Sequence, residues 1–95
     1  MNYKVKNDKL IDYILYTSLQ DFLCENHNLK TKEDIVDFVN NNIKDIHLLR
    51  YYGDFDNEFE YAILLKWVDG SAEIYDYITY ESVINKYNNG LLEVI

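Results

Sequence analysis

Residues 54–60 carry the most regular pattern of charged side chains in the sequence. Acidic residues occupy every second position there, and they are Asp54, Asp56, Glu58 and Glu60. In an extended segment, alternate side chains project from one face about 6.6–6.8 Å apart. A row of carboxylates at that spacing resembles the row of phosphates along one nucleic-acid strand and fits a basic groove. The alternative is a solvated loop or edge strand that its charge keeps from aggregating.

The same acids are a poor match to a calcium-binding EF-hand loop. Counted from Asp54, the sixth position is Phe59, where the sharp turn of that loop needs glycine. The twelfth position is Leu65, where the loop needs a bidentate glutamate. We therefore predict no dedicated metal site in this stretch.

The other residue types that carry chemistry are isolated along the chain. His27 and His47 have no partners at metal-ligand spacing, and Cys24, the single cysteine, cannot form an internal disulfide. The three glycines all fall at expected turns or helix ends, so no phosphate-binding loop is indicated. We expect no catalytic residues, no metal and no cofactor, and hence a protein that is not an enzyme.

Composition limits the class of protein further. The chain has 95 residues, 48% of them hydrophobic, and a net charge of −8 from 9 basic and 17 acidic residues. This indicates one folded domain over residues 1–95, and it argues against binding nucleic acid or anionic membranes directly. The longest apolar run, residues 61–65, is too short to span a bilayer, and the N-terminus lacks an apolar signal region. We expect a soluble cytoplasmic protein.

The hydrophobic spacing predicts an α+β domain in the order ααβββα. Helices are expected over residues 8–26, from Thr31 to about residue 42, and from residue 79 or 80 to 89. Three strands of an antiparallel sheet are expected over residues 46–52, 59–68 and 72–78. Residues 4–6 and 91–95 are candidates for short terminal strands. The helices should pack on one face of the sheet.

Asp69-Gly70 indicates a two-residue hairpin turn, which implies a register for the two flanking strands. The expected pairs are Trp67 with Ala72, Lys66 with Glu73, Leu65 with Ile74, Leu64 with Tyr75, Ile63 with Asp76, Ala62 with Tyr77, and Tyr61 with Ile78. This register puts Ala72, Ile74 and Ile78 on the core face with Trp67. Asp76 falls on that face too, which suggests a bulge, a strand end or a polar site.

The same register places Tyr75 and Tyr77 together on the face opposite Trp67. Tyrosine is abundant, at 10 residues, and exposed tyrosines are frequent in protein interfaces. Negative charge is also concentrated here, because two lysines oppose nine acids over residues 54–95. The candidate partner-binding residues are therefore Asp54, Asp56, Glu58, Glu60, Glu73, Tyr75, Asp76 and Tyr77.

In size, acidity and lack of catalytic residues, the chain resembles small phage-encoded anti-CRISPR and anti-restriction proteins, many of which are DNA mimics. Its abundance of Asn, Lys, Ile and Tyr is typical of AT-rich genomes, such as those of low-GC bacteria and their phages. The resemblance implies an inhibitor that occupies the nucleic-acid site of a basic defence protein such as a CRISPR effector. Two alternatives are an immunity protein or antitoxin against a basic nuclease, and a regulatory module that homodimerises.

Overall fold

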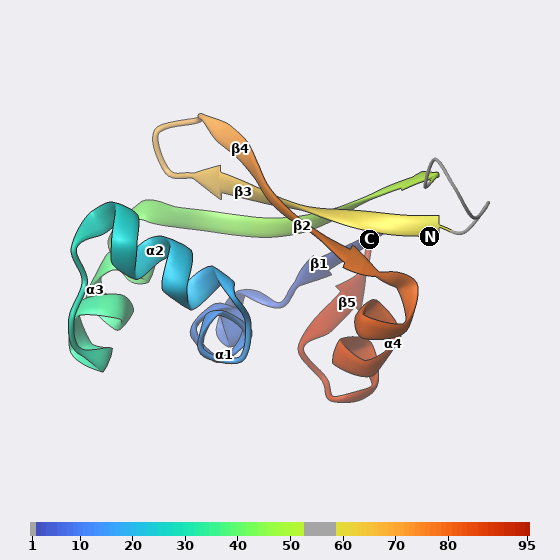
Figure 1. Cartoon of the computed structure of the whole chain (residues 1–95), viewed down its shortest axis with the longest axis horizontal. Helices are drawn as coiled ribbons and strands as arrows, with labels where there is room; N and C mark the ends of the chain where they lie inside the picture. Colours follow the sequence, from blue (N-terminus) through green and yellow to red (C-terminus); the bar gives the residue numbers. More distant parts are fainter. Residues whose placement is uncertain (1, 53–58) are drawn as a thin grey trace.

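Antiparallel strands form one sheet in the order β4-β3-β2-β1-β5, in a computed structural model that describes residues 2–52 and 59–95. The strands are β1 (Tyr3–Val5), β2 (Ile43–Tyr52), β3 (Phe59–Trp67), β4 (Ala72–Thr79) and β5 (Leu92–Val94). The helices are η1 (Asn7–Lys9), α1 (Leu10–Leu15), α2 (Leu19–His27), α3 (Lys32–Asn42) and α4 (Tyr80–Asn88). All the helices lie on one side of the sheet (Figure 1). The α+β class is confirmed.

The predicted order ααβββα with three strands is wrong, because both segments that were candidates for terminal strands belong to the sheet, as β1 and β5. Tyr3 pairs with Leu48 of β2 on one side and with Val94 of β5 on the other. β1 therefore lies inside the sheet and connects β5 to the rest of it. A strand of three residues is too short to show a period, so the sequence indicates it only as a candidate and its pairing establishes it.

The predicted first helix over residues 8–26 is divided into a 3₁₀ turn and two α-helices. The break falls at residues 16–18, where the Thr17 hydroxyl donates to the Ile14 carbonyl oxygen at 3.4 Å and accepts from the Leu19 amide at 3.3 Å. A hydroxyl that bonds nearby backbone groups competes with helical hydrogen bonds. The apolar spacing continues across the break, which is why the pattern alone predicted one helix.

α3 begins as the sequence predicts, with Thr31 as its N-cap. The Asp34 amide donates to the Thr31 hydroxyl and the Thr31 amide donates to the Asp34 carboxylate, both at 3.1 Å. The Lys30 amide also donates to that carboxylate. This capping box satisfies amides that the helix leaves without intrahelical partners.

The β3–β4 hairpin forms, but its turn is longer than expected. The Trp67 amide donates to the Ser71 carbonyl oxygen at 2.9 Å, so three residues, rather than two, lie between the hydrogen-bonded residues that close the turn. The Asp69 carboxylate accepts from the amide and the hydroxyl of Ser71, at 2.8 and 2.6 Å, and stabilises this turn. The pairs next to the turn are Lys66 with Ala72, Leu65 with Glu73, and Leu64 with Ile74.

The predicted pairs between Trp67 and Leu64 on β3 and their partners on β4 are therefore wrong by one residue. The register shifts between Ile63 and Leu64, so β4 has an extra residue, Tyr75, at this point. Beyond this bulge the predicted pairs are confirmed, from Ile63 with Asp76 to Tyr61 with Ile78. As a result Ile74 lies on the sheet face away from the helices and is 56% exposed, contrary to its predicted place in the core.

The core lies between the sheet and the helices. Ile46, Leu48, Ile63 and Leu65 of the two central long strands are buried against Leu19, Leu23, Ile35 and Val39. Several tyrosines belong to it as well: Tyr3, Tyr13 and Tyr61 are buried, and burial raises the pKa of the Tyr61 phenol. The high tyrosine content is thus partly structural. No helix in the described part of the chain has the length and hydrophobicity to cross a membrane.

Candidate functional site: an open sheet face and an aromatic pocket

The face of the sheet opposite the helices is uncovered, and we call it the outer face (Figure 1). Cross-strand pairing places Leu49 beside Ala62, Ala62 beside Tyr77, and Leu64 beside Ile74 on this face. Leu49, Ile74 and Tyr77 are 42%, 56% and 61% exposed. Large apolar side chains of β2 and β4, on either side of Ala62 and Leu64 of β3, therefore form an exposed patch.

Two of the predicted contact residues, Glu60 and Tyr77, come together at one end of the outer face. The ring of Tyr77 lies edge-on to the ring of Tyr51, with 5.2 Å between centroids and 63° between planes. The Tyr51 hydroxyl donates to a Glu60 carboxylate oxygen at 2.5 Å. Tyr51, which the sequence reasoning did not select, thus connects the predicted tyrosine to the predicted acid.

The other end of the outer face carries charges of opposite sign in pairs, since the Lys4 ammonium lies 3.4 Å from the Glu93 carboxylate. His47 lies beside Lys4 across the β1–β2 pair, and Lys66 lies beside Asp45 across the β2–β3 pair. Burial lowers the pKa of His47, and the charge of Lys66 lowers it further. The outer face therefore runs from paired charges, across an apolar centre, to a tyrosine pair that holds a glutamate.

Tyr75 lies on the opposite face from Tyr77, contrary to expectation. Its hydroxyl donates to the Ser18 carbonyl oxygen at 2.8 Å, and its ring lies 4.4 Å from that of Phe22, centroid to centroid. The bulge turns this side chain toward α2, because the extra residue reverses which side chains face the helices. Tyr75 therefore joins the sheet to the helical layer.

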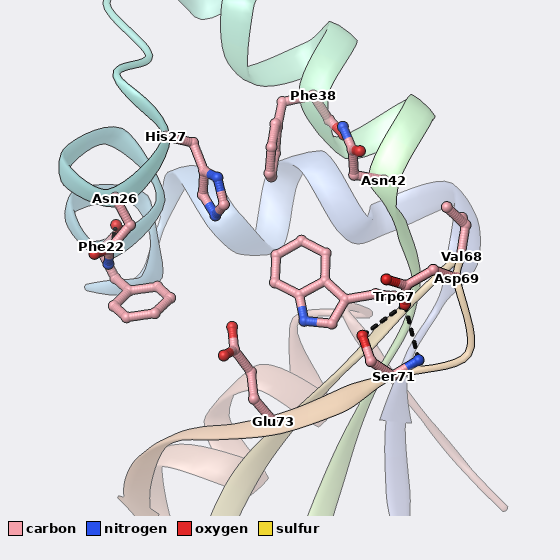
Figure 2. A pocket seen from close by; sticks show the side chains of 10 residues that line it. All are labelled: Phe22, Asn26, His27, Phe38, Asn42, Trp67, Val68, Asp69, Ser71 and Glu73. Carbon is pink, nitrogen blue, oxygen red and sulfur yellow. Dashed lines mark hydrogen bonds between the residues drawn. The ribbon is translucent and has the colours of Figure 1, made fainter.

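Glu73 is also on the helix side, where it borders a pocket (Figure 2). This pocket has a volume of about 540 Å³ and lies between α2, α3 and the β3–β4 hairpin. Four aromatic side chains line it: Phe22 and His27 from α2, Phe38 from α3, and Trp67 from β3. The Glu73 carboxylate points toward the space between the rings of Phe22, His27 and Trp67.

The remaining predicted contacts are not brought into these sites. Asp54, Asp56 and Glu58 lie outside the described residues. Asp76 is placed only by its backbone, which pairs with Ile63. The sequence reasoning missed the pocket because its rings come from three separate elements, and no local spacing indicates that they meet.

Among the described residues, no three His, Cys, Asp or Glu side chains come together as a metal site. In comparisons with known proteins, no family model, no curated protein and no solved structure matches the chain.

Proposed function

We propose that the protein is a non-catalytic inhibitor that binds a basic protein through its outer face. The partner class that we favour is a nucleic-acid-processing defence enzyme, such as a CRISPR effector, in a host infected by a phage or other mobile element that encodes this chain. The observation that carries the proposal is the uncovered sheet face, on which Tyr77 is 61% exposed next to the Tyr51–Glu60 pair.

The apolar centre of the outer face supports protein binding. Aromatic side chains with a polar tip contribute strongly to binding when a partner excludes water from them. Tyr77 has this form, and its ring contact with Tyr51 limits its motion before binding. Less conformational entropy is then lost in the complex.

Charge supports a basic partner. The net charge is −8, and Glu60 on the outer face is preceded in the sequence by Asp54, Asp56 and Glu58. Complementary charge accelerates association and orients the two proteins, and its effect weakens as salt is added. A groove that holds nucleic-acid phosphates offers the positive charge that such a surface needs.

The test starts with capture of binding proteins from lysates of low-GC bacteria and continues with the purified partner. We expect the partner's own nucleic-acid substrate to compete with this chain for binding. Tyr77→Ala and Glu60→Gln should each weaken the complex, roughly tenfold for the tyrosine. Tyr16→Ala is the matched control, because Tyr16 is 78% exposed and follows α1, in the helical layer.

Three outcomes would overturn the proposal. The first is a captured protein whose affinity is unchanged by Tyr77→Ala and by high salt. The second is a partner whose nucleic-acid substrate does not compete. The third is self-association through the exposed apolar centre of the outer face, which sedimentation of wild type and Tyr77→Ala would detect. A captured toxin nuclease would instead support the immunity-protein alternative.

A further inference from the structure

We propose that the aromatic pocket of Figure 2 binds an organic cation, namely a guanidinium or alkylammonium group at the end of an alkyl chain. The pocket lies on the helix-bearing side of the sheet, whereas the proposed inhibitor surface is the outer face. This inference therefore stands independently of the proposed function. It rests on the rings that form the walls, on the polar atoms between them, and on the size of the space.

The walls present aromatic rings from three directions. The centroid of the His27 ring lies 4.4 Å from that of Phe38 and 5.8 Å from that of Trp67. The centroids of the Phe38 and Trp67 rings are 5.9 Å apart, and the two ring planes meet at 81°. Phe22 stands on the other side of the opening (Figure 2). Ring faces attract cations through their quadrupoles, and tryptophan does so most strongly.

Core contacts hold three of the four rings in place. Phe22, Phe38 and Trp67 are partly buried and pack against the hydrophobic core, so each keeps one part of its surface open to the pocket. Phe22 also packs against the ring of Tyr75, whose hydroxyl donates a hydrogen bond to the Ser18 carbonyl oxygen. These three walls of the pocket are therefore in place before a ligand arrives, which lowers the entropic cost of binding.

The polar lining favours a ligand that donates hydrogen bonds. Asn26 donates its side-chain amide to the Phe22 carbonyl at 2.9 Å, and Asn42 donates to the Phe38 carbonyl at 3.0 Å. These bonds use the side-chain nitrogen of each asparagine, so the side-chain oxygen can accept a hydrogen bond from a ligand. The Glu73 carboxylate is an acceptor too, whereas that of Asp69 already accepts from Ser71. No lysine or arginine is among the lining residues in the described part of the chain.

A volume of about 540 Å³ accommodates the cationic group and part of its alkyl chain. A guanidinium can stack on the Trp67 indole while its edge donates to the Glu73 carboxylate. An alkylammonium can rest against the same rings without directional bonds. A simple metal ion would leave the apolar walls without contacts.

Trp67 is the single tryptophan of the chain, so its fluorescence reports on the pocket directly. We would titrate the full-length protein with N-acetylarginine methylamide and with choline. The matched neutral probes are N-acetylcitrulline methylamide and 3,3-dimethylbutan-1-ol. We expect saturable, millimolar binding of at least one cation. Its neutral counterpart should bind roughly tenfold more weakly, or not at all.

Two variants locate the binding. Glu73→Gln, on an edge strand, should weaken cation binding roughly threefold. Glu81→Gln removes the same charge from the exposed start of α4 and should leave cation binding unchanged. Trp67→Leu should weaken it roughly tenfold, measured by the NMR shifts of the His27 ring. Circular dichroism would check that each variant is folded.

The source of the cation is resolved by a third titration, with a short peptide that carries one internal arginine. Tighter binding of the peptide than of the capped amino acid identifies a protein side chain as the ligand, and equal binding identifies a free small molecule. The proposal is overturned if neutral and cationic probes bind equally. It is also overturned if neither cation shifts the Trp67 or His27 signals at high millimolar concentration.

Discussion

Tyr75 and Tyr77 are two residues apart on β4 and yet lie on opposite faces of the sheet. Tyr75 contacts Phe22 and donates to the Ser18 carbonyl oxygen, whereas Tyr77 contacts Tyr51 on the uncovered side. In a regular strand, residues at this spacing share a face. The bulge reverses this alternation, so that one tyrosine holds the helical layer and the other is available for a partner.

The two tyrosines should therefore respond differently to removal of their hydroxyl groups. Tyr75→Phe removes the bond to Ser18, and we expect it to lower the free energy of unfolding by about 0.5 to 1 kcal/mol. Tyr77→Phe is the comparison and should cost less stability, because Tyr77 is 61% exposed and water can replace any bond that its hydroxyl loses. Urea denaturation of the three proteins measures both effects. Equal losses would contradict this division of roles.

The capping box at the start of α3 should contribute measurably to stability. Thr31→Ala removes the side chain that accepts from the Asp34 amide, and we expect a loss of about 1 kcal/mol in the free energy of unfolding. Asn41→Ala is a suitable control, since Asn41 is exposed on the same helix. A similar loss in both variants would indicate a general effect on the helix rather than loss of the cap.

Asp34 should make stability depend on pH in the acid range. The amides of Lys30 and Thr31 donate to its carboxylate and hold its pKa below the ordinary aspartate value. Since the folded-state pKa is the lower one, this stabilisation is present above the unfolded-state pKa of about 4. It is lost as the pH falls through the folded-state pKa.

Asp34→Asn tests this dependence, because asparagine keeps an acceptor oxygen but does not titrate. The stability difference between wild type and variant should be largest near neutral pH and should shrink as the solution is acidified below about pH 4. Thermal unfolding across this range measures it. Two parallel stability curves would show that the carboxylate charge has no such role.

His47 on the outer face should titrate below the ordinary histidine value of about 6.5, because burial and the nearby charge of Lys66 disfavour its protonated form. A histidine with a lowered pKa contributes stability above its unfolded-state pKa. That contribution is lost as the pH falls through the folded-state value.

NMR titration of the His47 ring in wild type and in Lys66→Gln tests both causes. The midpoint should rise in the variant but remain below the ordinary value, because burial, the larger cause, is unchanged. A midpoint unaffected by Lys66→Gln would exclude the charge effect. Partner binding at the outer face should lower the midpoint further, because it buries the ring more.

Features set by neighbouring residues were predictable without tertiary information. The cap at Thr31, the helices α3 and α4, and the existence of the β3–β4 hairpin all follow from side-chain chemistry within a few positions. The α+β class follows too, because the apolar period changes from helical to alternating along the chain. These local preferences point to the same structure as the final packing.

Other features depend on contacts between distant segments. The place of β1 between β2 and β5 requires pairing of Tyr3 with both Leu48 and Val94, which no local pattern records. The longer turn at Asp69–Ser71 shifts the strand register by one residue next to the turn, and the bulge at Tyr75 cancels that shift farther along β4. That shift moves Ile74 out to solvent and Tyr75 toward the helices.

The candidate sites show the same difference between features set by neighbouring residues and features set by distant contacts. The sequence indicated an acidic, tyrosine-bearing region around Glu60, Glu73, Tyr75 and Tyr77, since charge and residue type can be read position by position. The division of that region between an open sheet face and an aromatic pocket came from the tertiary structure. A strand's two faces exchange with a shift of a single residue, and α2, α3 and the hairpin meet around the pocket only when the core packs.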